Sequence, residues 1–357
     1  VAGDVKAQIV ARVGYLPLAV KLAGEQLRRH DPARWLARFD ARKLRRRRPE
    51  DIHDSLFQTF FLSLNDLTEE DRRCYTALAI FPEDEPIPLV ALARLWGALV
   101  GLDEDAARDL MHDLAARALL QGSQPLSPGA SEGIPGFIVT LHDLLRDFIA
   151  DALGEQGARD AHRALLDAYR VTKEAKAWHT APDDGYLYPY LAYHLDALAD
   201  HDEEAANELR ALFATDAWLH VRVPADDFRY DGYLAGLTRA WRCAQAIAEQ
   251  QVTKGQPPLA VADCLHCAVI HTSINSLMTN YVPELVAMPL KTGQWSPENV
   301  VSLAQRISDP AKKALTLHAL LTTGKLTTSQ LAQVQNQALT ATRAIRNEVV
   351  RYQVLSK

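Results

Sequence analysis

Several features that define common protein classes are missing from this 357-residue sequence. It has only four cysteines, too few for a disulfide framework in a chain of this length, which indicates a reducing compartment. The formal net charge of −6 gives no reason to expect binding to nucleic acid or to an anionic membrane. No apolar run approaches the roughly 20 residues that a membrane-spanning helix needs. With 48% hydrophobic residues to build sizeable cores, we expect a cytoplasmic globular protein that does not enter the membrane.

The usual catalytic motifs are missing as well. The chain contains no phosphate-binding loop of the form Gly-x-x-x-x-Gly-Lys-Ser/Thr, and no apolar strand ending in paired acids for magnesium. No Ser/His/Asp or Cys/His set stands out either. We therefore expect no enzymatic activity from this chain alone, and no catalytic residue is assigned. The chain starts at Val1 with a pattern typical of the middle of a domain, so we expect it to be a piece of a longer protein.

What the sequence does contain is mostly helical periodicity. Val5–His30 predicts two helices separated by a turn, with Pro17 near the start of the second, where a missing N–H is tolerated. The basic run Arg42–Arg48 has no apolar period and is typical of a solvated linker. Such a run could also bind nucleic acid or act as an address signal.

The next hundred residues predict a winged helix, because helices are followed by a two-stranded hairpin and a further helix. Thr68 is a good N-cap for the second of these helices. The loop Gly122–Gly136, rich in Gly, Pro and Ser, would join the two strands. The expected helices are Ile52–Leu64, Glu69–Ile80, Pro88–Trp96, Leu102–Ala118 and His142–Leu153, and the expected strands are Leu119–Gln121 and Phe137–Leu141.

Beyond Gly154 the pattern is helical, with prolines between the segments. Ile307–Lys313 is echoed by Ile345–Arg351 at an offset of 38 residues, and periods near 40 suit helical pairs stacked in a solenoid. The fold class that follows is all-α, mainly helical, with one small β-hairpin wing. We expect four domains, at residues 1–48, 49–153, 154–255 and 256–357.

Two short motifs point to a family. Gly14-Tyr15-Leu16-Pro17-Leu18-Ala19 resembles the Gly-Leu-Pro-Leu motif of NB-ARC proteins, with Tyr15 where plant members usually have a second glycine. Leu141-His142-Asp143 resembles the Met-His-Asp motif that opens the last helix of the winged helix in that family, with Leu in place of Met. The segment Tyr186–Leu195 is similar to the helical domain that follows. The resemblance covers roughly residues 5–250.

The resemblance implies a regulatory part of an intracellular, nucleotide-switched signalling ATPase in bacterial defence or signalling. Pro17 and Leu18 would lie against the adenine side of the nucleotide, and His142 would reach the β-phosphate of bound ADP. Asp143 would orient that corner. ADP or ATP with Mg would bind the full-length protein, and no cofactor is expected for the fragment alone. The partners would be its own nucleotide-binding domain, further copies on activation, and a protein trigger recognised by the helical repeats.

The literal Met111-His112-Asp113 is rejected as the sensor motif, because it lies inside a helix with no strand before it. On this reading residues 1–48 are the end of the small helical subdomain plus a basic linker. Residues 49–153 are the winged helix, residues 154–255 the helical domain and residues 256–357 the start of a sensor solenoid.

Two other functions stay open at this point. A winged helix with a helical sensor could be a transcriptional regulator, although Leu102–Ala118 is acidic and would repel DNA phosphates. The second alternative is a helical adaptor protein. The set Cys264, Cys267 and His271 shares a helix face but lacks the fourth ligand of a structural zinc site, so we expect no metal.

Overall fold

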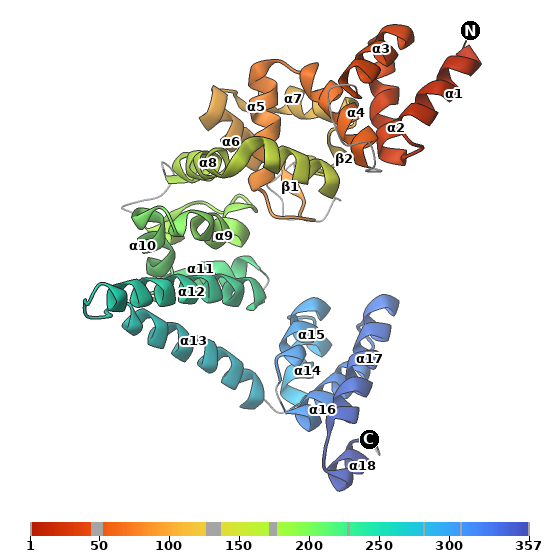
Figure 1. Cartoon of the computed structure of the whole chain (residues 1–357). Coiled ribbons are helices and arrows are strands. Elements are labelled where there is room, and N and C mark those ends of the chain that lie inside the picture. Colours follow the sequence, from red (N-terminus) through yellow and green to blue (C-terminus); the bar gives the residue numbers. More distant parts are fainter. Residues whose placement is uncertain are drawn as a thin grey trace. The chain divides into compact units, whose positions relative to one another are not determined.

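The computed structural model describes residues 2–43, 53–125, 137–170, 177–226, 229–280, 283–307 and 309–355. It is mainly helical, with one small sheet, as the sequence predicts (Figure 1). The chain divides into two compact units, residues 1–176 with 181–187, and residues 177–180 with 188–357. None of the described helices is both long and apolar enough to cross a membrane.

The first unit begins with three helices that precede the winged helix. They are α1 (Ala2–Arg12), α2 (Pro17–Leu27) and α3 (Pro32–Lys43). The third was not expected from the sequence. It forms because Trp35 and Phe39, one turn apart, are fully buried and their rings stack at 5.2 Å between centroids. The predicted linker Arg42–Arg48 therefore begins inside α3, and its part beyond Lys43 lies outside the described residues.

The winged helix follows the predicted order. Thr68 accepts a hydrogen bond from the backbone N of Asp71 at 3.1 Å, which confirms it as the N-cap of the second helix. Phe57 and Phe60 of the first helix pack on Phe148 of the last, at 4.7 and 5.6 Å between ring centroids. The helices are α4 (His53–Asn65), α5 (Glu69–Thr76) with a 3₁₀ turn (Ala77–Ile80), α6 (Leu89–Val100), α7 (Glu104–Ala116) and α8 (Asp143–Arg170).

The wing differs from the expectation in detail. A two-residue strand, β1 (Ile87–Pro88), adds to the expected pair, so the antiparallel sheet has the order β1–β3–β2. Strand β2 (Gln121–Pro125) extends into the segment predicted to be loop, and β3 spans Phe137–Thr140. Between Gln121 and Gln124 one extra residue interrupts the register, and Gly122 has the positive φ of 66° that such a bulge favours. The rest of the predicted loop, residues 126–136, lies outside the described residues.

Helix α8 continues well past the predicted end at Leu153. Gly154 interrupts it with φ 67° and ψ 170°, values outside the helical region that only glycine adopts readily. Beyond the break, Tyr169 donates a hydrogen bond to Asp184 at 2.8 Å, and Arg94 of α6 pairs with the same carboxylate at 3.2 Å. Burial, followed by the Asp184 charge and hydrogen bond, raises the pKa of Tyr169, which keeps the phenol a donor. The far part of α8 is thus fastened to the winged helix.

The second unit is a succession of helices. Ser296, Asp309 and Thr327 cap three of them through side-chain acceptors, as helix starts require. The helices are α9 (Leu187–Ala199), whose first residue belongs to the first unit, α10 (Glu203–Ala211), α11 (Ala217–Ala225), α12 (Asp231–Thr253), α13 (Val261–Asn280), α14 (Pro283–Thr292), α15 (Pro297–Gln305), α16 (Pro310–Leu321), α17 (Thr328–Ala344) and α18 (Glu348–Leu355).

The internal repeat has a structural counterpart. Ile307 follows α15 and Ile345 follows α17, and both side chains are buried. Two residues later Asp309 caps α16 and Asn347 caps α18, each accepting two backbone N–H groups at 2.8–3.2 Å. The 38-residue echo therefore marks the same helix-to-helix turn twice, which is the geometry of a helical repeat.

Candidate functional site

The turn before Pro17 is set by the way α1 ends. Gly14 donates to the carbonyl of Ala11 at 3.2 Å and Tyr15 to that of Val10 at 3.1 Å, which is the Schellman arrangement. Gly14 and Tyr15 have φ values of 72° and 58°. The left-handed conformation explains why a glycine would suit position 15, and it leaves the Tyr15 side chain 71% exposed.

Pro17 opens α2 directly after this turn. It occupies the first helical position, where its missing N–H costs nothing, and no side chain caps this helix start. Pro17 is exposed and Leu18 is half-buried, while Ala19 turns into the core. The first candidate segment thus offers an uncovered pyrrolidine ring with an apolar neighbour. A flat ring such as adenine could pack on this surface.

His142 stands immediately before α8, at the end of the strand β3. Its carbonyl accepts from the N atoms of Leu145 and Arg146 at 2.8 and 2.9 Å, so it is the N-cap residue. Its ring contributes as well, because Nδ1 accepts from the backbone N of Leu144 at 3.3 Å. Arg146 fixes this helix start from the other side by donating to the carbonyl of Phe81.

The cap decides what the half-buried imidazole of His142 can do. A nitrogen that accepts a hydrogen bond carries no proton, so in the neutral ring the proton sits on Nε2. Nε2 is then a donor, and the helix dipole adds a partial positive charge at the N-terminus of α8. An anionic oxygen is the ligand that this arrangement fits. Asp143 is exposed, and no hydrogen bond to His142 is formed by its carboxylate among the described residues.

The structure places the two candidate segments at two helix starts of the same unit. Within the described part of the chain, no hydrogen bond or ion pair joins Pro17 or Leu18 to His142 or Asp143. Gly14 lies beside α4, since a β-carbon built on it would be 3.7 Å from Ser55 Oγ. The roles assigned to these four residues stay predictions.

The literal Met111-His112-Asp113 lies inside α7, as expected, and its residues have structural neighbours. Met111 is fully buried and His112 is exposed. Asp113 pairs with Arg117 of the same helix at 2.6 Å and with Arg29, at the end of α2, at 3.4 Å. Its carboxylate is therefore engaged in holding α7 beside the first helices.

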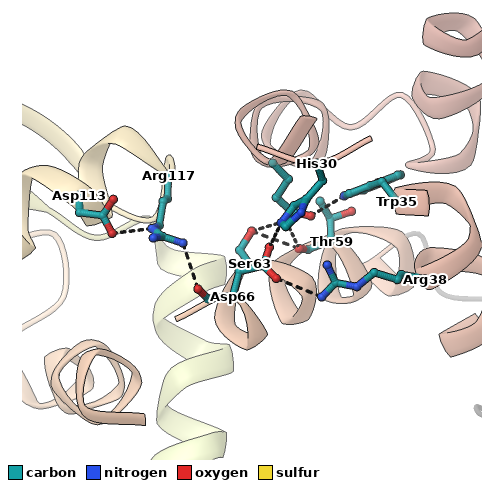
Figure 2. Close-up of polar contacts among 9 residues, drawn as sticks. His30, Trp35, Arg38, Thr59, Ser63, Asp66, Asp113 and Arg117 are labelled. Atoms are coloured by element: carbon teal, nitrogen blue, oxygen red, sulfur yellow. Dashed lines mark hydrogen bonds and ion pairs between the residues drawn. The ribbon is translucent and has the colours of Figure 1, made fainter. Parts of the chain in front are cut away.

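Asp113 belongs to a larger set of polar contacts, which we call the polar joint and which sequence reasoning missed (Figure 2). Asp66, just after α4, accepts from His30 at 2.6 Å and from Arg38 at 3.0 Å, and its carbonyl accepts from Arg117 at 3.3 Å. The joint consists of Gln26, Arg29, His30, Trp35, Arg38, Thr59, Ser63, Asp66, Asp113 and Arg117.

Gln26 is the buried centre of the polar joint. Its Nε2 donates to the Thr59 carbonyl at 2.8 Å and also to Ser63 Oγ, and its Oε1 accepts from the Trp35 indole. These partners come from α3 and α4, so one amide links three helices. A glutamine on the apolar side of a predicted helix was the signal that could have revealed this contact.

The Cys264, Cys267 and His271 set lies on α13, as its spacing predicts. Burial, then Cys264 and Asp263, raises the pKa of Cys267 to about 11, and burial and Asp263 raise the pKa of Cys264. His271 is engaged with Asn275 at 3.2 Å. Raised thiol pKa values oppose metal binding, because the ligand is the thiolate. In the described residues no three His, Cys, Asp or Glu side chains are grouped around a metal position.

The fold defines a mainly helical protein with a winged helix and helical repeats. Among curated proteins it is similar to a probable disease resistance protein of Arabidopsis thaliana, 29% identical over 54% of this chain and 23% of that protein. It is also similar to apoptotic protease-activating factor 1 of Rattus norvegicus, 26% identical over 53% of this chain and 15% of that protein. Disease resistance protein ADR1 of Arabidopsis thaliana is 32% identical over 39% of this chain and 18% of that protein. No family model matches the chain.

These relatives show that the chain is related to the NB-ARC/STAND family of signal-transduction proteins. The matched part spans between 15 and 31% of the length of the curated relatives. What a complete protein of this kind binds or assembles with is therefore a matter of proposal.

Proposed function

We propose that this chain is the regulatory and sensor part of a nucleotide-switched signalling protein, with ADP holding the inactive state. The observation that carries the proposal is the His142 cap, which leaves Nε2 as a hydrogen-bond donor beside the start of α8. That donor fits a phosphate oxygen. ADP supplies the negative charge of its β-phosphate, and Pro17 and Leu18 would receive the adenine side.

The residues of this chain would bind and report the nucleotide rather than hydrolyse it. One imidazole and one helix start cannot replace a phosphate cradle, and the sequence contains neither that loop nor the acids that hold Mg²⁺. The chain alone should bind ADP weakly and release no phosphate from ATP. Turnover would depend on a nucleotide-binding domain in the longer protein.

The proposed switch has two states that the nucleotide stabilises differently. In the closed state His142 touches ADP, and in the open state that contact is lost, so the nucleotide biases the equilibrium by its differential affinity. Release would permit assembly with further copies, and the helical repeats would receive a protein trigger. The names of the relatives refer to disease resistance and apoptosis, which supports a signalling role in defence, and we place that role in the cytoplasm.

The test compares the histidines of Leu141-His142-Asp143 and of the literal Met111-His112-Asp113. In the longer protein, His142→Ala should lose about 1.5–3 kcal/mol of ADP affinity, the value of a hydrogen bond to a charged group, or roughly 10- to 100-fold. His112→Ala is the matched control, because His112 is also followed by Asp but lies exposed inside α7. Nucleotide retained after purification and ADP binding by calorimetry give the readout. Equal ADP affinity in wild type and His142→Ala contradicts the proposal.

A further inference from the structure

A cavity of 740 Å³ lies in the helical repeats, between the end of α15, the start of α16 and the second half of α17. Arg306 and Lys313 line one part of it, and Asn336 and Gln337 another. Half-buried Pro310 and exposed Ala344 add an apolar surface. None of the described lining residues is acidic. The cavity therefore has a basic, an amide and an apolar part.

The two lining cations differ in how far they are already neutralised. Arg306 is paired with the carboxylate of Asp231. Lys313 donates to the backbone carbonyl of Gln305 at 2.6 Å, which uses one of its three N–H groups and brings no opposing charge. No ion pair of Lys313 is found among the described residues. Lys313 is thus the cation that a carboxylate ligand would meet.

Gln337 supplies an independent sign of a missing partner. Its side-chain oxygen Oε1 is buried, and it has no hydrogen-bond partner in the described part of the chain. A buried acceptor without a donor is destabilising, and such groups in native structures often have a functional reason. An N–H donor in the cavity would relieve that cost if the amide turned toward it. Backbone N–H groups of an extended peptide are donors of this kind.

We propose that this cavity binds an acidic peptide segment of a partner protein. Its carboxylate pairs with Lys313, a backbone N–H donates to Gln337, and an aliphatic side chain packs on Pro310 and Ala344. The proposal names the ligand chemistry of the sensor role and rests on that part of the proposed function, but it does not involve the nucleotide. Loss of peptide binding with ADP binding intact, or the reverse, separates the two.

The experiment measures binding of a dye-labelled, acetylated hexapeptide of alternating glutamate and leucine to the whole chain by fluorescence anisotropy. A hexapeptide with lysine in place of glutamate tests charge, and unlabelled free glutamate tests whether a carboxylate alone suffices. Wild type should bind the acidic peptide and not the basic one. Lys313→Glu should weaken binding at least about tenfold, because attraction becomes repulsion.

Two further variants keep the test independent of folding. Lys325→Glu makes the same charge change at an exposed position that does not line the cavity, and it should leave affinity within about twofold. Gln337→Leu should weaken peptide binding several-fold without lowering the thermal unfolding midpoint, because it removes a buried unpaired acceptor. Absence of binding at millimolar acidic peptide overturns the proposal. So do equal losses in Lys313→Glu and Lys325→Glu, or equal competition by free glutamate.

Discussion

Two places in the first unit carry Met or Leu followed by histidine and aspartate, Met111-His112-Asp113 and Leu141-His142-Asp143, and their surroundings are opposite. In α7, Asp113 forms ion pairs with Arg117 and Arg29, and Met111 is buried. Both side chains therefore have a structural role. At the start of α8, His142 caps the helix with one ring nitrogen and keeps the other as a donor, and Asp143 is exposed. The same two residue types thus serve structure in one helix and remain available to a ligand at the start of the other. The position of a motif relative to a helix start therefore predicts its role better than a literal match of its residues does.

The largest effect is expected on the structural side of this comparison. Gln26→Leu removes the amide that joins α2, α3 and α4, and it leaves the buried indole N–H of Trp35 without its acceptor. We expect a loss of roughly 3 kcal/mol in unfolding free energy, from one orphaned donor and the hydrogen bonds removed with it. Urea denaturation followed by tryptophan fluorescence measures this loss.

Gln8→Leu is the control for that substitution, because it makes the same change at an exposed position of α1. It should alter stability by less than about 0.5 kcal/mol. If both variants unfold at the same urea concentration, the polar joint contributes nothing specific.

The polar joint also shows where sequence reasoning stops. Thr68 was predictable as a cap because a cap is a local pattern, and α2 was predictable as a helix from its period. Gln26 meets Trp35 and Ser63, which are 9 and 37 residues away, and such pairs are set by tertiary packing. For the same reason α3 was missed, since Trp35 and Phe39 give a helix face only once they are buried.

The wing and the candidate site follow the same rule. Strand β1 has two residues, and it exists only through its pairing with β3, which no local pattern announces. The shifted β2 depends on the bulge at Gly122. Pro17 was predictable near a helix start from its residue type, and His142 from the change of strand pattern to helix pattern, and both lie at helix starts. That His142 caps its helix through Nδ1 depends on ring orientation, which sequence does not encode locally.

A smaller effect is expected on the ligand side, in the longer protein. Under the proposed switch Asp143 orients the nucleotide corner only in the closed state, so Asp143→Val should favour the assembled, ADP-free state. Coupling of this kind is about 1–3 kcal/mol, or several-fold to about a hundredfold in population. ADP retained after purification and particle size by light scattering report the shift.

Asp113→Val is the matched control in the literal motif. It removes two ion pairs whose partners are partly exposed, so it should cost less than about 1 kcal/mol of stability and leave nucleotide preference unchanged. Identical ADP retention in Asp143→Val and Asp113→Val would show that the choice of Leu141-His142-Asp143 as the sensor is wrong.

The smallest effect concerns the other candidate segment, in which Tyr15 has an exposed side chain and a left-handed backbone conformation. Tyr15 has φ 58° and is 71% exposed, so its side chain gains little from packing while the left-handed conformation costs about 1–2 kcal/mol for a non-glycine residue. Tyr15→Gly removes that cost but adds backbone freedom to the unfolded chain, and a net stabilisation of about 0.5–1 kcal/mol should remain. Tyr15→Ala keeps the strained backbone and should give no such gain. Both variants remove the tyrosine ring, so the difference in their stability measures the cost of the left-handed conformation alone. Chemical denaturation of the three proteins side by side measures it. Equal stability of the glycine and alanine variants would mean that the turn before Pro17 is not held in the left-handed conformation, and that Pro17 is not positioned by the end of α1.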